Sequence, residues 1–387
     1  MFCVSGSVIR LLYPLLFLGL LVCDARASNS AQPEAEVRTD IVDPVEAAPP
    51  PAADEAAPDS SPIRLSIAAV GDMMIGTDYP RNHLPDDDGV SFFSAVTPIL
   101  AAADIAIGNL EGTLIDGGTP AKECKNLDAC YLFRSPARYA AHYRDAGFDV
   151  LSLANNHARD FGEDGRSATM AALDAVGIYH SGRAGEFASF EQDGLRVAVL
   201  AYAVTQESNL LHDYELAIQT VTGFAATHDI VIVTFHGGAE GASMMHVPFA
   251  EEEYYGEPRG DVARFSRSVI DAGADLVLGH GPHVVRGMEV YKERLIAYSL
   301  GNFATYYGIS VAGAKGIAPI LLATLDADGR FIEGEIISTV QIRPDGPGID
   351  DEQRALHLIR GLSREDFSDP GLIFHPDGRL QPASRPQ

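Results

Sequence analysis

Basic residues are scarce in this sequence, and their scarcity argues against a large class of function. Lysine and arginine together number 28, against 54 aspartates and glutamates, which gives a formal net charge of −26 at pH 7. Proteins that bind nucleic acids hold phosphates with clustered lysines and arginines. We therefore expect no nucleic-acid partner, although a metal site could still hold an anionic substrate.

Cysteine is also scarce, with four residues in the whole chain. Cys3 and Cys23 lie in the apolar N-terminal segment, so only Cys124 and Cys130 belong to the rest of the sequence. No second pair of cysteines or histidines lies near these two, which argues against a structural zinc site. In an oxidising compartment they are candidates for a disulfide that closes a short loop, and the alternative is two free thiols.

The apolar run from Leu11 to Val22 is shorter than the roughly 20 residues that span a membrane. Arg10 precedes this run, and Ala25-Arg26-Ala27 follows it as a small-x-small cleavage site. This arrangement is typical of a secretory signal peptide over residues 1–27. We expect an exported protein, periplasmic or in the cell envelope. The alternative is an uncleaved segment that anchors it to the membrane.

Composition divides the remaining chain into three parts. Residues 28–61 are rich in alanine, proline and acidic residues (EAAPPPAADEAAPDSSP), which favours a disordered linker. Residues 62–343 carry a regular apolar pattern and predict one folded domain. Residues 344–387 form a mixed C-terminal extension with a helix near 351–361. Hydrophobic residues make up 46% of the 387, enough to bury a substantial core.

Apolar runs that predict strands alternate with segments of helical periodicity within this domain. The strand candidates are residues 63–70, 105–108, 150–153, 195–201, 230–235, 276–278 and 295–299. The helix candidates are residues 92–102, 136–146, 165–175, 217–227 and 262–272. Two further strands flank a turn at Asp328-Gly329. Several runs, such as VIVTF, are apolar throughout, as in sheets covered on both faces. The pattern therefore predicts a layered α/β fold.

Polar side chains of ligating or catalytic type follow several of these strands. They are Asp72, Asn109, Glu111, Asn155, Asn156, His157, His236, Glu240, His280 and His283. Ligands of open α/β sheets bind at the carboxyl ends of the strands. We therefore expect these side chains to meet in one cleft.

The segment LANNHARDFG places three consecutive polar residues after a strand. Asparagine supplies a neutral carbonyl ligand, and His157 is either a metal ligand or a proton donor to a leaving oxygen. Asp160 lies three residues further on and could orient His157. Alternatively, Asn155 or Asn156 could cap the next helix.

Histidines dominate two later segments, FHGGAE and LGHGPHVV. His236 leads into two glycines, and Glu240 could orient a ligating histidine. His280 and His283 are separated by Gly-Pro, so a rigid turn could aim both rings at one point. Paired imidazoles suit zinc, manganese, iron or nickel better than calcium. In YSLGNF, which lacks the serine-hydrolase elbow, Asn302 could line the same cleft.

Six motifs resemble, in the same order, those of the bacterial capsule-synthesis family CapA. They are GDMMIG, GNLEG, LANNHARDFG, FHGGAE, GHGPH and YSLGNF. The resemblance covers roughly Leu65 to Phe303. That family is associated with poly-γ-glutamate synthesis and export. Membership implies the calcineurin-like metallophosphoesterase fold, a layered β-sandwich flanked by helices.

The wider phosphoesterase superfamily binds two metal ions, and two of its ligand positions are altered here. Asp72 matches the aspartate of the first motif, but Met74 stands where its histidine would be. Asn109 holds the place of the bridging aspartate, with Glu111 two residues later. These departures favour a single ion or a weakened second site.

The resemblance and the residue pattern together give a predicted site. The predicted metal ligands are Asp72, Asn109, Glu111, Asn156, His236, His280 and His283. The predicted catalytic residues are His157 and Asp160, and the predicted supporting residues are Asn155, Glu240 and Asn302. The expected cofactor is one or two divalent transition-metal ions, manganese, zinc or iron.

Three hypotheses follow for function. The first is an exported metal-dependent hydrolase that acts on an anionic polymer, a phosphoester or a γ-glutamyl amide in capsule synthesis, beside a membrane-bound synthase complex. The second is a non-catalytic factor that guides the polymer, which the altered Met74 and Asn109 favour. The third is a periplasmic phosphodiesterase or nucleotidase, which rests on fold analogy alone.

Overall fold

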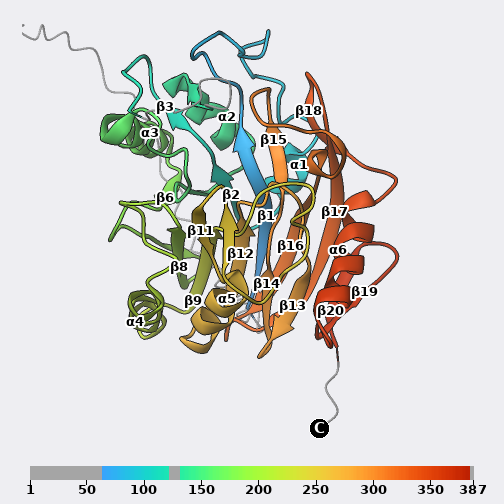
Figure 1. Ribbon diagram of the computed structural model, residues 1–387. Coiled ribbons are helices and arrows are strands. Elements are labelled where there is room, and N and C mark those ends of the chain that lie inside the picture. The colour runs from blue at the N-terminus through green and yellow to red at the C-terminus, as the bar shows by residue number, and fades with distance from the viewer. Residues whose placement is uncertain (1–62, 122–130, 384–387) are drawn as a thin grey trace, which may run out of the picture. The chain divides into compact units, whose positions relative to one another are not determined.

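The computed structural model describes residues 63–121 and 131–383, which form two stacked β-sheets with helices on the outer faces (Figure 1). The predicted signal peptide, the linker and the pair Cys124 and Cys130 lie outside the described residues. Among the described residues, no helix is both long enough and apolar enough to cross a membrane.

The larger sheet has ten strands in the order β19-β20-β17-β16-β1-β2-β5-β6, with β15 beside β1 and β18 beside β17. Strands β1, β2, β5, β6 and β15 are mutually parallel where they pair, and the others are antiparallel to their neighbours. The bounds are β1 (Arg64–Met74), β2 (Ile105–Leu110), β5 (Val150–Ser152), β6 (Tyr179–Ser181), β15 (Asn302–Thr305), β16 (Ile317–Asp326), β17 (Phe331–Ile342), β18 (Gly346–Ile349), β19 (Leu372–Phe374) and β20 (Arg379–Pro382).

The smaller sheet has six strands in the order β13-β14-β12-β9-β8-β7, and its inner strands β14, β12, β9 and β8 are parallel. The bounds are β7 (Ala188–Gln192), β8 (Leu195–Ala203), β9 (Ile230–His236), β12 (Leu276–His280), β13 (Met288–Tyr291) and β14 (Arg294–Ala297). Two strand pairs lie outside the sheets, β3 (Thr113–Leu114) with β4 (Arg134–Ser135) and β10 (Glu252–Tyr254) with β11 (Glu257–Gly260).

Strand residues alternate between a shared core and two outer cores. Leu65 and Ile67 of β1 pack in the cluster that also holds Val197 and Val199 of β8, so this cluster lies between the sheets. Ala68 of β1 points to the opposite face of its sheet, into a separate cluster. Because both faces of each sheet are buried, the strands need apolar residues at almost every position, which explains their continuous apolar runs.

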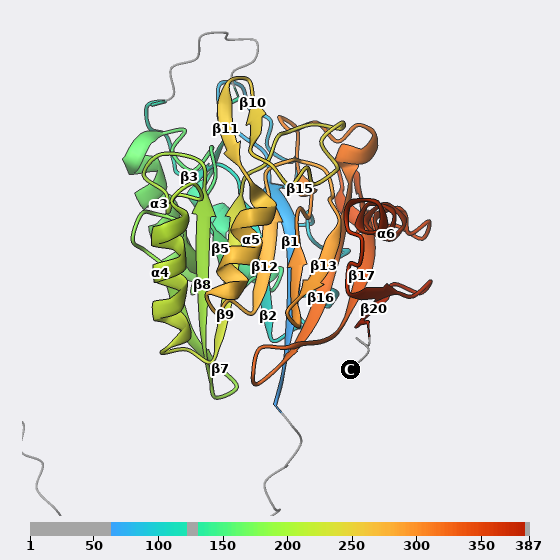
Figure 2. The same cartoon turned by 60° about the horizontal axis from the view of Figure 1, so that its bottom comes forward.

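Helices cover the two outer faces and close one edge. Helices α1 (Thr97–Leu100), α2 (Ala140–Asp145) and α3 (Gly162–Val176) pack on the larger sheet, after the short 3-10 helix η2 (Ala137–Tyr139). Helices α4 (Tyr214–Ala225) and α5 (Val262–Asp271) pack on the smaller sheet. Helix α6 (Arg354–Asp366) lies beside β17 (Figure 2), and its apolar side chains belong to the cluster between the sheets. The predicted α/β fold, a layered β-sandwich flanked by helices, is confirmed.

Two sequence expectations differ from the structure. The helix expected over residues 92–102 is only the single turn α1, which begins beside Pro98 after a series of turns. The segment after residue 343 adds strands β18 and β20 to the larger sheet beside β17, so this extension packs as part of the sandwich.

Candidate metal centre and cleft

The carboxyl ends of the parallel strands gather the polar side chains of both sheets. In the larger sheet, Asp72 of β1 stands in register with Asn109 of β2 on one side and Asn302 of β15 on the other. In the smaller sheet, His236 and His280 are register partners at the last positions of β9 and β12. Strand pairing thus fixes the spacing within each group.

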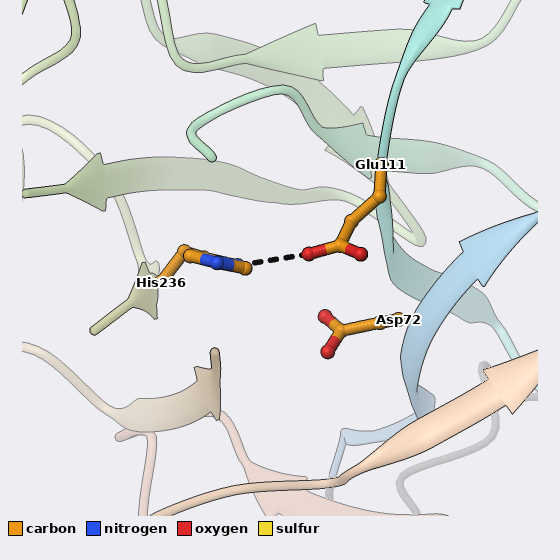
Figure 3. Close-up of side chains that lie close together, drawn as sticks. All are labelled: Asp72, Glu111 and His236. Carbon is orange, nitrogen blue, oxygen red and sulfur yellow. Dashed lines mark ion pairs between the residues drawn. The ribbon is translucent and has the colours of Figure 1, made fainter. Parts of the chain in front are cut away.

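Asp72, Glu111 and His236 form the closest group of ligand-type side chains. One ligand atom from each lies within 4.8 Å of the others, and all three residues are buried. Figure 3 shows the Glu111 carboxylate aimed at the His236 ring, with Asp72 beside them. The Nδ1 atom of His236 lies 3.6 Å from Glu111 Oε1. The group joins the two sheets, since Asp72 and His236 come from different ones.

Several buried polar atoms in and beside this group have no hydrogen-bond partner in the part of the chain that the structure describes. Both carboxylate oxygens of Glu111, Nε2 of His236 and Nδ1 of His280 find no hydrogen-bond partner among the described residues. Buried polar atoms without partners are rare in proteins because desolvation is not compensated. A cation held by Asp72, Glu111 and His236 would compensate the two carboxylate oxygens of Glu111, so the residues present fit a divalent metal ion.

A chain of amide hydrogen bonds fixes how Asn109 faces this group. The backbone N–H of His157 donates to Asn155 Oδ1 at 3.0 Å, which leaves the Asn155 amide nitrogen to donate. That nitrogen donates to Asn109 Oδ1 at 3.1 Å and to the carbonyl of Leu110 at 2.8 Å. Asn109 Nδ2 therefore points the other way and donates to Asp72 Oδ1 at 2.8 Å.

This orientation bears on the predicted ligand role of Asn109. An amide nitrogen carries hydrogens and no free lone pair, so the group that Asn109 presents beside Asp72 is a donor. In this arrangement Asn109 holds the Asp72 carboxylate and does not offer an oxygen to a metal.

The two histidines of GHGPH take different places. His280 Nδ1 lies 3.5 Å from Asp72 Oδ1. His283 Nδ1 lies 3.1 Å from Asp72 Oδ2 and 2.9 Å from Asn302 Oδ1, so both contacts occupy the same ring nitrogen. The turn between them requires Gly281, whose φ is +114° and whose added Cβ would lie 2.6 Å from the carbonyl oxygen of Gly237. The turn therefore packs directly against the loop that follows His236.

Burial and mutual charge set the protonation of this group. Burial and the charge of Asp72 raise the pKa of Glu111 well above its usual value. Burial also acts to raise the pKa of Asp72, but the neighbouring imidazoles of His280 and His283 outweigh burial and lower that pKa far below its usual value. Burial lowers the pKa of His236. A neutral His236 beside a charged Asp72 is the pairing that metal binding needs.

The pKa of His283 shifts in the opposite direction to that of His236. Burial disfavours its charge, but the carboxylates of Glu111 and Asp72 outweigh burial and raise the pKa of His283 to about 10. Its Nε2 atom also lies 3.8 Å from Glu240 Oε2. Without a metal ion, a protonated His283 therefore balances part of the negative charge.

His157 forms a separate pair with Asp160. Its Nδ1 lies 2.8 Å from Asp160 Oδ2, and the same oxygen accepts the backbone N–H of Phe133 at 2.7 Å. The Phe133 ring packs on the imidazole with a centroid distance of 4.3 Å. Because Nδ1 is engaged by Asp160, Nε2 is the nitrogen left for a ligand.

A cleft of about 570 Å³ connects the metal group to His157. Its lining residues are Glu111, Tyr131, Phe133, Asn156, His157, Glu240, Tyr254, Tyr255, Glu257, His283, Asn302, Gly308, Ile309, Ser310 and Lys315. Asn156 contributes a buried side-chain oxygen with no partner among the described residues. Metal-type ligands and an acid–base pair therefore face one space.

Some predicted site residues lie outside the closest group. The side chain of Asn155 contacts Asn109, and the side chain of Asn302 contacts His283 and lines the cleft. Glu240 lies on the cleft wall beside His283. Met74 is buried and is not among the residues that line the cleft.

The sequence reasoning missed several residues of the cleft wall. Tyr254, Tyr255 and Glu257 come from the hairpin β10–β11, and Lys315 comes from the 3-10 helix η3 (Gly313–Gly316). The acidic and aromatic run EEEYYGE was a faint signal for the hairpin. Nothing in the sequence around Lys315 distinguishes it from a surface lysine.

Comparisons with known proteins agree on a family. The family model described as "Bacterial capsule synthesis protein PGA_cap" matches residues 66–307. The PGA biosynthesis protein CapA of Bacillus subtilis (strain 168) is 31% identical over 256 residues, which are 62% of this chain and 63% of that protein. The capsule biosynthesis protein CapA of Bacillus anthracis is 28% identical over 263 residues, covering 62% and 59%. The chain thus spans less than two thirds of the length of these relatives.

One similar solved structure is the purple acid phosphatase PPD1 from yellow lupin seeds. It is 10% identical, the match covers 72% of this chain and 52% of the phosphatase, and the TM-score is 0.33. A likeness this slight has no bearing on activity.

Proposed function

Because the chain belongs to the bacterial capsule synthesis protein family PGA_cap, we propose that it is an exported, metal-dependent hydrolase of capsule polymer synthesis. Its substrate is an anionic glutamate polymer of the cell envelope, cut at a γ-glutamyl amide bond. The observation that carries the proposal is the buried group Asp72, Glu111 and His236, which opens onto a cleft that also holds the His157–Asp160 pair.

Asp72, Glu111 and His236 would hold one divalent ion, with His280 beside Asp72. An ion bound there would polarise the scissile carbonyl and make a water molecule more acidic. A single ion is favoured because Asn109 presents its amide nitrogen to Asp72, and because Met74 cannot replace the missing histidine.

His157 would move the proton of the reaction. Asp160 holds Nδ1 and so orients the ring, in the way a carboxylate orients a catalytic imidazole. The Nε2 atom would take a proton from the attacking water and deliver it to the leaving amine as the amide bond breaks. Phe133 packs on one face of the ring and keeps it in this orientation.

The decisive experiment compares metal content with turnover. The full chain should contain about one tightly bound divalent ion by elemental analysis and should release glutamate from γ-linked oligoglutamate. The His157→Ala variant should keep the same metal content and lose at least a hundredfold in turnover, since general acid catalysis contributes about 10²–10⁴-fold. The matched control is His180→Ala, because this half-buried histidine of β6 lies outside the lining of the cleft.

Either of two results would overturn the proposal. One is a protein that carries no divalent ion after purification in metal-supplemented buffer. The other is a His157→Ala variant that turns over γ-linked oligoglutamate at the normal rate.

A second function has one observation in its favour. Asn109 holds Asp72 with a donor where a bridging carboxylate would be needed for two ions, which suits a non-catalytic protein that guides the polymer. A protein that binds oligoglutamate, carries no metal and cuts neither γ-glutamyl amides nor phosphoesters would support that function.

A further inference from the structure

The cleft has one wall formed by the hairpin β10–β11, which projects beyond the ends of the strands (Figure 2). Tyr255 at its tip is 93% exposed and adopts a left-handed backbone with φ of +51°. Its ring lies 4.4 Å, centroid to centroid, from that of Tyr254. An aromatic residue that is strained and gains almost no burial contributes little to stability, which favours a role in ligand contact.

The hairpin is held rigidly although its tip is exposed. Arg259 of β11 is fully buried, and its Nε donates to the carbonyl of Gly238 at 2.9 Å. Glu252 of β10 makes a two-pronged ion pair with the buried Arg286, with both contacts at 2.7 Å. These contacts tie the hairpin to the loop after His236, so the wall has a fixed position beside the metal group.

This wall carries negative charge. Glu240 and Glu257 share the single guanidinium of Arg259, at 3.1 Å and 3.2 Å. Glu240 also lies 3.8 Å from Nε2 of the protonated His283, so Glu257 is the less fully compensated of the two carboxylates. Burial and the nearby charge of Glu240 raise the pKa of Tyr254 to about 12, so its hydroxyl stays protonated and its ring lies in the same negative field.

Another segment of the lining carries positive charge. Lys315 is the only lysine or arginine among the lining residues, and it makes no ion pair with any part of the chain that the structure describes. Its backbone carbonyl accepts a hydrogen bond from Asn302 Nδ2 at 3.2 Å, and Asn302 contacts His283. The free ammonium of Lys315 therefore stands on a segment fixed to the metal group.

These charges limit what the cleft can accept. The interior of a glutamate polymer presents one carboxylate per unit, and on the hairpin side of the cleft such a unit would face the carboxylates of Glu240 and Glu257, away from Lys315. Like charges at close range oppose binding. A ligand with one positive and one negative group would match both parts of the lining.

On the basis of the proposed function, we infer that the cleft binds the amino-terminal unit of the glutamyl chain, which has a free ammonium and a free carboxylate. Glu257 and Glu240 receive the ammonium, which also contacts the faces of Tyr254 and Tyr255, as cations do on aromatic rings. Lys315 receives the α-carboxylate. The scissile γ-amide of that unit is then directed towards the metal group and His157.

The test measures binding without catalysis. Isothermal titration calorimetry on the full chain in chelator compares γ-glutamylglutamate with its N-acetyl derivative, which lacks the ammonium. We expect N-acetylation to weaken binding at least tenfold. Because no metal or turnover is involved, this result is independent of whether the protein is a hydrolase.

Matched variants test which residues bind the ammonium group and which bind the carboxylate of the ligand. Glu257→Gln should abolish the preference for the free amine, whereas Glu253→Gln, on the same hairpin but outside the lining, should preserve it. Lys315→Met should weaken both dipeptides, whereas Lys292→Met, whose lysine pairs with Asp271, should weaken neither. Equal affinity for the two dipeptides, or equal effects of Glu257→Gln and Glu253→Gln, would overturn the inference.

Discussion

At the scale of single residues, Glu111 is a carboxylate buried in unfavourable surroundings. It is 1% exposed, neither oxygen has a hydrogen-bond partner among the described residues, and Asp72 lies beside it. A buried polar group without a partner destabilises a protein by about 1–3 kcal/mol. Glu111 therefore favours the binding of a cation and, without one, lowers the free energy of unfolding.

Glu111→Gln should separate these two effects. In chelator the variant should be at least as stable as the wild type, and an added divalent ion should no longer raise its unfolding temperature. Burial and Asp72 raise the folded-state pKa of Glu111, so the folded wild type binds an extra proton at intermediate pH. Its stability should therefore fall relative to the variant as pH rises through the raised pKa. Thermal unfolding across pH measures this difference, and a variant that still gains stability from metal would contradict it.

Asn155 also acts at this scale, because it determines which atom Asn109 turns towards Asp72. In Asn155→Asp, an oxygen replaces the amide nitrogen that donates to Asn109 and to the carbonyl of Leu110. Acceptors would then face acceptors in a buried place, and we expect a loss of about 1–3 kcal/mol in the free energy of unfolding. Urea denaturation gives this value. The control is Asn82→Asp, which is exposed and keeps the oxygen that accepts the N–H of Leu84. Equal stabilities of the two variants would refute the role of Asn155.

At the scale of elements, helix α6 depends on a carboxylate that precedes it. Its N-cap residue Gln353 has φ of +53° and makes no side-chain cap. Asp350, 5% exposed, accepts the backbone N–H of Arg354 at 3.0 Å and pairs with its guanidinium at 2.9 Å. The helix contributes Leu356 and Ile359 to the cluster between the sheets, so its first turn must be fixed for the sandwich to close.

Asp350→Ala should reduce the free energy of unfolding by about 1 kcal/mol, as loss of a helix cap does. The hydrogen bond with Arg354 lowers the folded-state pKa of Asp350. Its contribution is therefore complete above the ordinary carboxyl pKa and is lost as pH falls through the lowered value. Urea denaturation at neutral and at acidic pH should show the difference shrinking with acid. The exposed neighbour Asp351→Ala serves as the control, and a difference that is constant with pH would argue against the ion pair.

At the scale of the whole molecule, the net charge of −26 opposes the approach of an anionic polymer. Long-range repulsion slows association, and salt screens it within about 10 Å at 0.1 M ionic strength. The association rate constant with long polyglutamate should therefore rise with added sodium chloride, in contrast to most protein–polyanion pairs. Stopped-flow measurements over a salt series test this, with a neutral polymer as control. A rate that falls with salt would point to a basic binding surface that is absent from the described residues.

The sequence by itself determined the strands, the layered α/β class and the family, because each depends on a local pattern. Continuous apolar runs mark strands buried on both faces, and the polar residues that follow them mark the strand ends, so Asp72, Glu111 and His236 could be singled out without coordinates. The same reasoning placed Asp160 beside His157, since residues three apart in a turn can meet.

Only the tertiary structure decided which of these side chains meet and which atoms they present. The direction of the Asn109 amide follows from a hydrogen bond made by the backbone of His157, far away in sequence. The cleft wall needs Glu257 and Lys315, which are brought together by a hairpin and a 3-10 helix with no apolar periodicity to reveal them. Hydrogen-bond direction and charge balance depend on neighbours from distant parts of the chain. The local periodicity of the sequence does not reveal which residues these neighbours are.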